Sequence, residues 1–192
     1  MDSKIFAASI IALVLIFYAV LAWRRKARFR ALALELGGTY TDTGKFAPGK
    51  VTGRDFSIQA RTVGFGRHSA YYTMLEVFGG DMPDKYLLKT PFFENYPNWK
   101  FAKTLGTSNE RVFVTTISVP RYLELSQEQQ ATLLSWLDRS SLNIKEFHTC
   151  LKRSRIKELV VSETSISTQF KGIVSDPGRL RDTLNVLRRF PH

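Results

Sequence analysis

An uninterrupted apolar run near the start of the chain limits what its first quarter can form. The run covers residues 5–23, nineteen positions without a side chain that is charged near neutral pH. A helix rises about 1.5 Å per residue, so these positions cover roughly 28 Å, close to the roughly 30 Å hydrocarbon thickness of a bilayer. Eleven of the nineteen are Ile, Leu, Val or Phe, the side chains that most favour insertion. Residues 5–23 are therefore predicted to form a transmembrane helix.

A dense block of positive charge follows the run directly. Its sequence is RRKARFR, and its five cations are Arg24, Arg25, Lys26, Arg28 and Arg30. Before the run, Lys4 is the one basic residue. Since the flank richer in Lys and Arg stays in the cytoplasm, residues 1–4 are expected on the non-cytoplasmic side and the rest of the chain in the cytosol. The five cations are expected to orient the helix and to favour anionic lipid at the cytosolic face.

A cleaved signal peptide is the main alternative for this segment. Signal peptides carry positive charge before the apolar run and small residues at a cleavage site. Here Asp2 partly offsets Lys4, and the candidate cleavage pair of Val20 and Ala22 is followed at once by Trp23 and the basic block. We therefore expect an uncleaved single-pass anchor. An interfacial amphipathic helix would need a charged stripe, which the run does not have.

The charge and cysteine content of the chain limit the partners and the cellular compartment that can be expected for it. The formal net charge is +11, of which residues 1–30 contribute +5 (six basic, one acidic) and residues 31–192 contribute +6 (22 basic, 16 acidic). Nearly half of the excess lies beside the expected membrane, which favours a membrane surface over nucleic acid as its partner. A single cysteine, Cys150, suits a reducing compartment. The layout is similar to that of bacterial inner-membrane proteins with one N-terminal span and a small cytosolic domain, and we expect this location.

The segments after the run predict an α+β domain. Good helix formers continue to Leu36, and Gly37 and Gly38 supply a helix end, so residues 24–38 are expected to form a basic juxtamembrane helix that continues the span. Residues 39–192 are expected to form one cytosolic domain with a mostly antiparallel sheet and two or more C-terminal helices. The expected strands cover residues 56–61, 70–78, 86–89, 111–119, 156–161 and 166–170, and residues 44–53 are expected to form turns.

Two helices are predicted in the C-terminal third of the chain. Ser126 and Gln129 form a capping box that opens a helix reaching about Arg139. Its buried face is expected to contain Ala131, Leu134 and Leu137. The second helix begins with Asp176 as N-cap and Pro177 at the first helical position. Its expected buried stripe consists of Leu180, Leu184 and Leu187.

The candidate chemical motifs are weak, and no catalytic, cofactor or metal site is predicted from them. Gly64-Phe65-Gly66 lacks the third glycine of a dinucleotide fingerprint and precedes a strand, which favours a hairpin turn. His148 and Cys150 have no further metal ligands or base-orienting partner in an adjacent motif. Asp81 and Asp84 flank a Met-Pro loop in a pattern typical of a soluble surface.

Two segments are candidate contact surfaces for a membrane-associated protein partner. One is an aromatic loop with Phe92, Phe93, Tyr96 and Trp99, and the other is a basic turn with Lys152, Arg153, Arg155 and Lys157. The sequence thus predicts a membrane-anchored, non-enzymatic binding or scaffolding module of undefined oligomeric state. A membrane-tethered enzyme and a small-ligand sensor with a cavity lined by Tyr71, Tyr72 and Phe78 are the alternatives.

Overall fold

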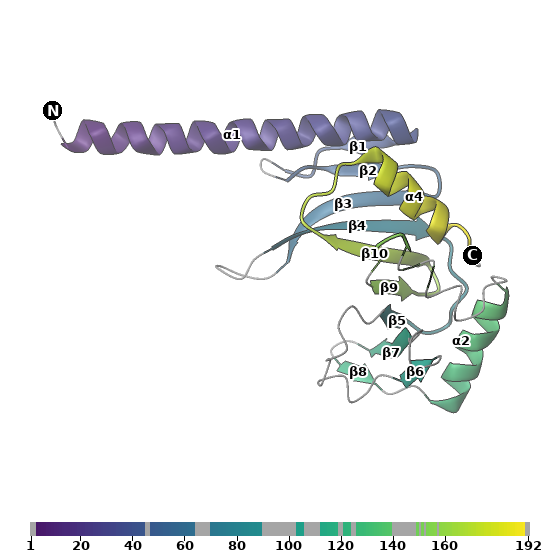
Figure 1. The fold of residues 1–192 in the computed structure, drawn as a ribbon. Helices are drawn as coiled ribbons and strands as arrows, with labels where there is room; N and C mark the ends of the chain where they lie inside the picture. The colour runs from purple at the N-terminus through teal and green to yellow at the C-terminus, as the bar shows by residue number, and fades with distance from the viewer. Residues whose placement is uncertain are drawn as a thin grey trace.

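The fold is α+β, as the sequence predicts. The computed structural model describes residues 3–44, 47–63, 70–89, 103–105, 112–118, 121–123, 126–139, 149, 151, 153–156 and 158–190. Within this part of the chain, ten strands form one antiparallel sheet, and long helices pack beside it. A straight N-terminal helix passes over one end of the sheet and projects well beyond it (Figure 1).

The N-terminal helix, α1 (Ser3–Leu36), is continuous over 34 residues. It runs through the predicted boundary at Trp23 without a break, since the sequence on both sides lacks proline and glycine. Its C-terminal end has the left-handed cap predicted at the glycines. Gly37 adopts φ +67°, and the Gly38 N–H donates to the Ala33 carbonyl at 2.8 Å while the Gly37 N–H donates to Leu34 at 3.3 Å. This pair of bonds is a Schellman motif, which stops the helix and turns the chain into the sheet.

The strands lie in a single order across the sheet. Neighbouring strands follow the sequence β1-β2-β3-β4-β10-β9-β5-β7-β6, and β8 pairs with β7. Their bounds are β1 (Thr39–Thr41), β2 (Lys50–Thr52), β3 (Phe56–Val63), β4 (Ala70–Phe78), β5 (Tyr86–Lys89), β6 (Lys103–Leu105), β7 (Val112–Ser118), β8 (Arg121–Leu123), β9 (Glu158–Val161) and β10 (Ser165–Lys171). The β10 strand inserts beside β4, and β9 then pairs with β5. C-terminal strands therefore join the two ends of the sheet, so the whole chain must fold before the sheet is complete.

Strands β3 and β4 form the predicted hairpin, with Phe56 opposite Val77 and Val63 opposite Ala70. Phe56, Ile58 and Ala60 are buried, as the alternation requires. Of the polar residues between and after them, Gln59 is half-buried and Arg61 is exposed, but Ser57 is buried and its hydroxyl donates to Glu76 Oε2 at 3.3 Å. The expectation of turns alone across residues 44–53 is wrong for its last part. Lys50–Thr52 pairs with both β1 and β3, and its three residues are too few to show a two-residue period.

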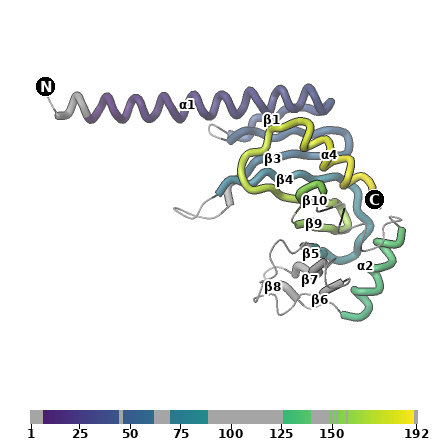
Figure 2. Tube along the Cα trace, viewed as in Figure 1, coloured from purple at the N-terminus to yellow at the C-terminus, as the bar shows by residue number. Residues whose placement is uncertain are grey.

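The two predicted helices are present, and both have the predicted caps. In α2 (Gln127–Arg139), the Gln129 N–H donates to Ser126 Oγ at 3.1 Å, and the Ser126 N–H donates to Gln129 Oε1 at 3.1 Å. In α4 (Pro177–Leu187), Asp176 Oδ1 accepts from the N–H groups of Gly178 and Arg179. A continuous trace shows α4 lying across β3, β4 and β10, close to the C-terminus (Figure 2).

The hydrophobic core includes residues from α1, α2, α4 and the central strands. On α4 the buried residues Leu180, Leu184 and Leu187 are those predicted. On α2 the predicted face was right for Leu137, which is buried, and wrong for Ala131, which is exposed; Leu134 is half-buried against the core, and Leu133 and Trp136 are the other buried residues. The larger Trp136 decides the orientation, because it stacks on Phe190 with the ring centroids 5.4 Å apart, and a buried indole contributes more apolar area than an alanine methyl.

Candidate functional site

The two halves of α1 have opposite environments. Residues 7–20 are all exposed, and their side chains are apolar or small, so that 6% of the most apolar stretch is buried. Further along the same helix, Phe29, Leu32 and Ala33 lie in the hydrophobic core. The helix is long and apolar enough to cross a membrane. An exposed apolar surface of this length is unusual for a protein in water, where apolar patches are normally covered.

Four of the five cations after the apolar half divide between two flanks of α1, because residues are about 100° apart around a helix. On one flank, Lys26 Nζ lies 2.7 Å from Asp42 Oδ2. The Arg30 guanidinium lies over the Tyr40 ring, 5.2 Å from its centroid. The Lys26 ammonium holds the pKa of the Asp42 carboxyl below its ordinary value of 3.8. Of these two cations, Lys26 is held in an ion pair and Arg30 makes a cation–π contact.

On the other flank, Arg25 and Arg28 border a hollow between α1 and the sheet. The hollow has a volume of about 400 Å³, and it is lined by Arg25, Arg28, Ala70, Tyr71, Lys171, Gly172, Ile173 and Ser175. Ala70 and Tyr71 begin β4, and Lys171 ends β10, so the sheet contributes the strand ends that lie beside the helix. The turn after Lys171 is set by Gly172, whose φ of +90° favours glycine.

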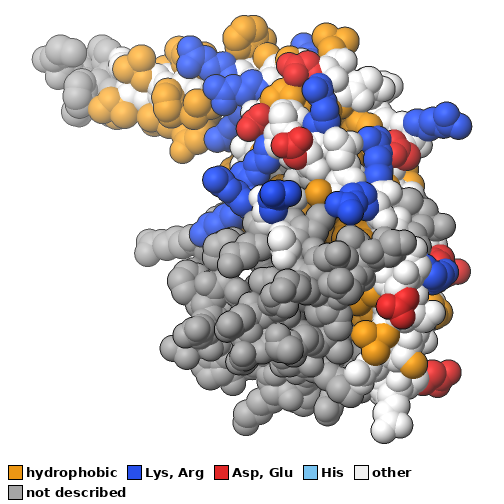
Figure 3. All heavy atoms as spheres, turned by 45° about the vertical axis from the view of Figure 1, so that its right-hand side comes forward, with side chains coloured by type: hydrophobic (Ala, Val, Ile, Leu, Met, Phe, Trp, Pro, Cys, Tyr) orange, Lys and Arg blue, Asp and Glu red, His pale blue; other side chains and the backbone are white. Residues whose placement is uncertain are grey.

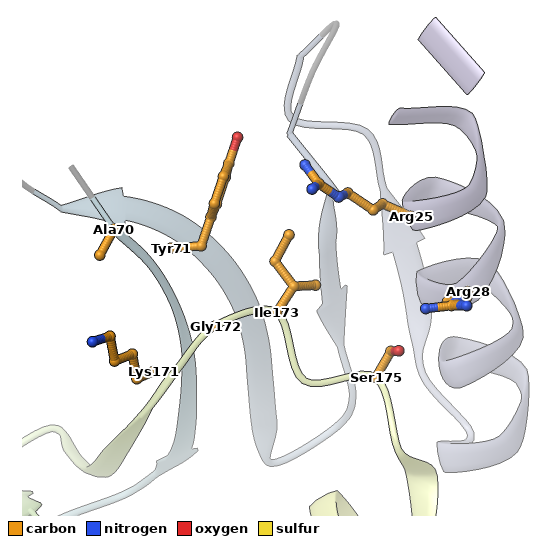
Figure 4. A pocket seen from close by; sticks show the side chains of 8 residues that line it. All are labelled: Arg25, Arg28, Ala70, Tyr71, Lys171, Gly172, Ile173 and Ser175. Carbon is orange, nitrogen blue, oxygen red and sulfur yellow. The ribbon is translucent and has the colours of Figure 1, made fainter. Parts of the chain in front are cut away.

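The side chains in this hollow have distinct positions (Figure 4). Arg25 reaches from α1 toward Tyr71, and its guanidinium carbon lies 5.2 Å from the centroid of that ring. Ile173 lies between them, and Ser175 lies on the side of α1. Lys171 is on the opposite side, and its side chain points away from the two arginines. Apolar surface thus lies at the centre, and the cations and hydroxyls lie around it.

The hollow is electropositive. The described residues of its lining include three cations and no carboxylate. Asp176 follows Ser175 directly, but its carboxylate accepts from the first N–H groups of α4. Among the described residues, the salt bridges are Lys26–Asp42, Arg139–Asp81 and Arg188–Asp55, and they leave Arg25, Arg28 and Lys171 out. Basic side chains also gather on the surface where α1 joins the domain (Figure 3).

The carboxylates considered as candidate acid–base residues have structural positions. Asp81 forms an ion pair with Arg139 at the end of α2. Asp84 Oδ2 accepts from Gln129 Nε2 at 3.0 Å, and it is near the buried Tyr86 hydroxyl. Both aspartates therefore attach the β4–β5 connection to α2. Burial, together with the Asp84 charge, raises the pKa of Tyr86 to about 12.

The predicted contact surfaces are described only in part. Arg153 and Arg155 are exposed, and Arg155 adopts a left-handed backbone with φ +55°. Their sequence neighbours Lys152 and Lys157, and the aromatic residues Phe92, Phe93, Tyr96 and Trp99, lie outside the described residues. The same holds for His148, Cys150 and the 64–66 glycine motif. These candidates stay predictions.

The proposed sensor cavity is contradicted. Tyr71 and Tyr72 are consecutive on β4 and so point to opposite faces of the sheet, and Phe78 lies at the other end of the strand, 39% exposed. Tyr71 lines the hollow instead. Its role there was missed because its neighbours Arg25 and Ser175 are far from it in sequence.

Comparisons with known proteins give little guidance for this chain. No protein-family model matches it, and a search of curated proteins gives no match. Among solved structures, the chain is similar to the crystal structure of the mycobacterial trehalose monomycolate transport factor A, TtfA, with 11% sequence identity and a TM-score of 0.41. The likeness covers 87% of this chain and 96% of that chain. At this level it supports no argument about function.

Proposed function

We propose that the protein is a single-pass, membrane-anchored, non-enzymatic module, whose α+β domain binds or scaffolds membrane-associated partners at the cytosolic face. The observation that carries this proposal is the division of α1 into an exposed apolar half and a half that belongs to the domain core. A bilayer would cover the apolar half, and covering it in this way leaves every core contact of the other half intact.

Attachment through a continuous helix would confine the domain close to the bilayer surface. A module held there meets membrane-bound partners at a higher effective concentration than a free one does. The interaction would then need only modest intrinsic affinity. The exposed Arg153 and Arg155 are candidate contacts for such a partner, together with the predicted basic residues Lys152 and Lys157 and the separate predicted aromatic segment of residues 92–99.

The same helix favours an anchor over a cleaved signal sequence. Ala22, one of the two small residues of the candidate cleavage pair, is buried in the middle of α1. Cleavage there would cut α1 at a buried residue, seven residues before Phe29 of the core. Signal peptidase acts on an extended chain, and an uninterrupted helix that reaches Leu36 would have to unwind first.

Membrane integration and topology are tested with the full chain. Extraction of membranes with alkaline carbonate should leave the protein in the pellet, and its mass should match the uncleaved sequence. For topology, a cysteine placed at Ser3 should react with an impermeant maleimide in intact cells, whereas one placed at Glu163 should react only after lysis. A soluble, shortened product would refute the anchor, and the reverse labelling pattern would refute the orientation.

A scaffold is tested by its neighbours in the cell. Proximity labelling from the full chain should enrich a small set of membrane-associated proteins, and a variant lacking residues 1–30 should lose them. Reversing the charges at Arg153 and Arg155 should reduce recovery of those neighbours if this turn is the contact. Absence of enrichment in the full chain would argue against the scaffold.

A further inference from the structure

We propose that the hollow between α1 and the ends of β4 and β10 binds the phosphate of an anionic membrane lipid. This inference rests on the proposed membrane anchor, which it extends from a general attraction to a defined site. The expected ligand is a phospholipid with net negative charge, held by Arg25 and Arg28 with Ser175 and Tyr71 around it.

The position of the hollow along α1 is that of a lipid headgroup. Trp23 ends the apolar run and is 67% exposed, and indole rings favour the headgroup level of a bilayer. At about 1.5 Å per residue, Arg25 and Arg28 lie roughly 3 and 7.5 Å beyond it along the helix. The phosphates of the adjoining leaflet occupy this depth. A lipid can therefore place its headgroup in the hollow while it stays in the bilayer.

The chemistry of the lining suits a phosphate with apolar material next to it. Guanidinium groups bind phosphate oxygens with two parallel hydrogen bonds, and they are weakly hydrated. The Ser175 hydroxyl and the Tyr71 phenol add further donors. Ile173 and the Tyr71 ring lie centrally, where the glycerol and first acyl carbons of a lipid would contact them.

The arginines are partly arranged for this role before any ligand binds. Arg25 is half-buried and held over the Tyr71 ring, so less side-chain freedom is lost on binding. No described carboxylate forms a salt bridge with Arg25 or Arg28. On the other flank, Lys26 is already paired with Asp42, and Arg30 lies over Tyr40. The cations of one helix thus differ in position: Arg25 and Arg28 line the hollow, and Lys26 and Arg30 do not.

This difference supplies matched variants for the test. Arg25→Gln with Arg28→Gln removes two charges from the hollow, and Arg24→Gln with Arg30→Gln removes two from outside it. Arg25→Lys with Arg28→Lys keeps the charge but removes the planar fork of each guanidinium. Arg24, Arg28 and Arg30 are exposed on α1 and Arg25 is half-buried, so these substitutions should have small effects on folding.

The assay is native mass spectrometry of the full chain in detergent, titrated with phosphatidylglycerol, with phosphatidylcholine and separately with glycerol 3-phosphate. We expect one phosphatidylglycerol per chain, with saturable binding and preference over phosphatidylcholine. The glutamine pair in the hollow should raise the apparent Kd by roughly tenfold or more, since charged hydrogen bonds are lost. The lysine pair should raise it severalfold, and the outer pair by less than twofold.

Three results would overturn the proposal: no saturable lipid binding, an equal loss in the outer pair, or glycerol 3-phosphate binding at least as tightly as the lipid. The second result would mean diffuse electrostatic attraction, and the third would mean a soluble phosphate ligand. Carbonate extraction of the same variants separates this test from that of the anchor. A chain that stays in the membrane but has no saturable lipid site refutes the site alone.

Discussion

Replacement of Phe29 by alanine tests whether the second half of α1 belongs to the domain core. The Phe29 side chain is 0% exposed and lies in the main hydrophobic cluster. Removal of a buried phenylalanine costs about 3–5 kcal/mol, from lost transfer free energy and the cavity left behind. At roughly 2–4 °C per kcal/mol for a chain of this size, the Tm should fall by about 10 °C.

Leu34→Ala is the matched control, because Leu34 lies on the same helix but is 83% exposed. Its replacement should change the free energy of unfolding by less than about 0.5 kcal/mol. The measurement is thermal unfolding of the full chain in detergent micelles, followed by tryptophan fluorescence. Equal Tm shifts for the two variants would refute the assignment of this half of α1 to the core, and with it the rigid attachment of the domain.

Further predictions concern caps and titration. Ser126→Ala should lower the free energy of unfolding by about 1 kcal/mol, because the capping box is lost, whereas Ser135→Ala in the middle of the same helix should be neutral or slightly stabilising in denaturant titrations. In the folded state the Tyr86 hydroxyl stays protonated above pH 10, because its pKa is about 12. The stability that the protonated Tyr86 confers is therefore present below pH 10 and is lost as the pH rises toward 12. Tyr86→Phe should flatten that decline, measured as denaturation midpoints against pH. The Asp42 carboxyl should titrate below 3.8 by NMR, so its stabilising contribution is fully present above pH 3.8 and is lost as the pH falls from there through the lowered pKa. Lys26→Gln should bring the pKa back up, and an unchanged value would contradict the ion pair.

Local signals in the sequence were sufficient for the helices and their ends. The two glycines after Leu36 predict the Schellman cap, and Ser126 with Gln129 predicts the capping box, because each motif consists of groups within a few residues of one another. The hairpin of β3 and β4 was predictable for the same reason. Its alternating side chains and short connection are local properties.

Features that depend on distant residues were not predictable. The orientation of α2 depends on Trp136 meeting Phe190, more than fifty residues further along the chain. Strand β2 is too short for a periodic signal and is stabilised by both its neighbours. The hollow brings Arg25 next to Tyr71 and Ser175. Composition showed that the juxtamembrane cations exist, and tertiary structure alone shows that they are not equivalent.

In the proposed anchored state, the unbroken course of α1 would fix the orientation of the domain as well as its distance from the bilayer. A domain on a flexible linker turns freely and can present any surface to the lipid or to a neighbouring protein. Here the first break in α1 is at Gly37, roughly 20 Å of helix beyond Trp23. The helix already packs into the domain core before that break. If the helix tilts or rotates in the membrane, the sheet must turn with it as one body. In the proposed topology, a protein that binds the apolar half of α1 within the bilayer would therefore determine which face of the domain is exposed to the cytosol.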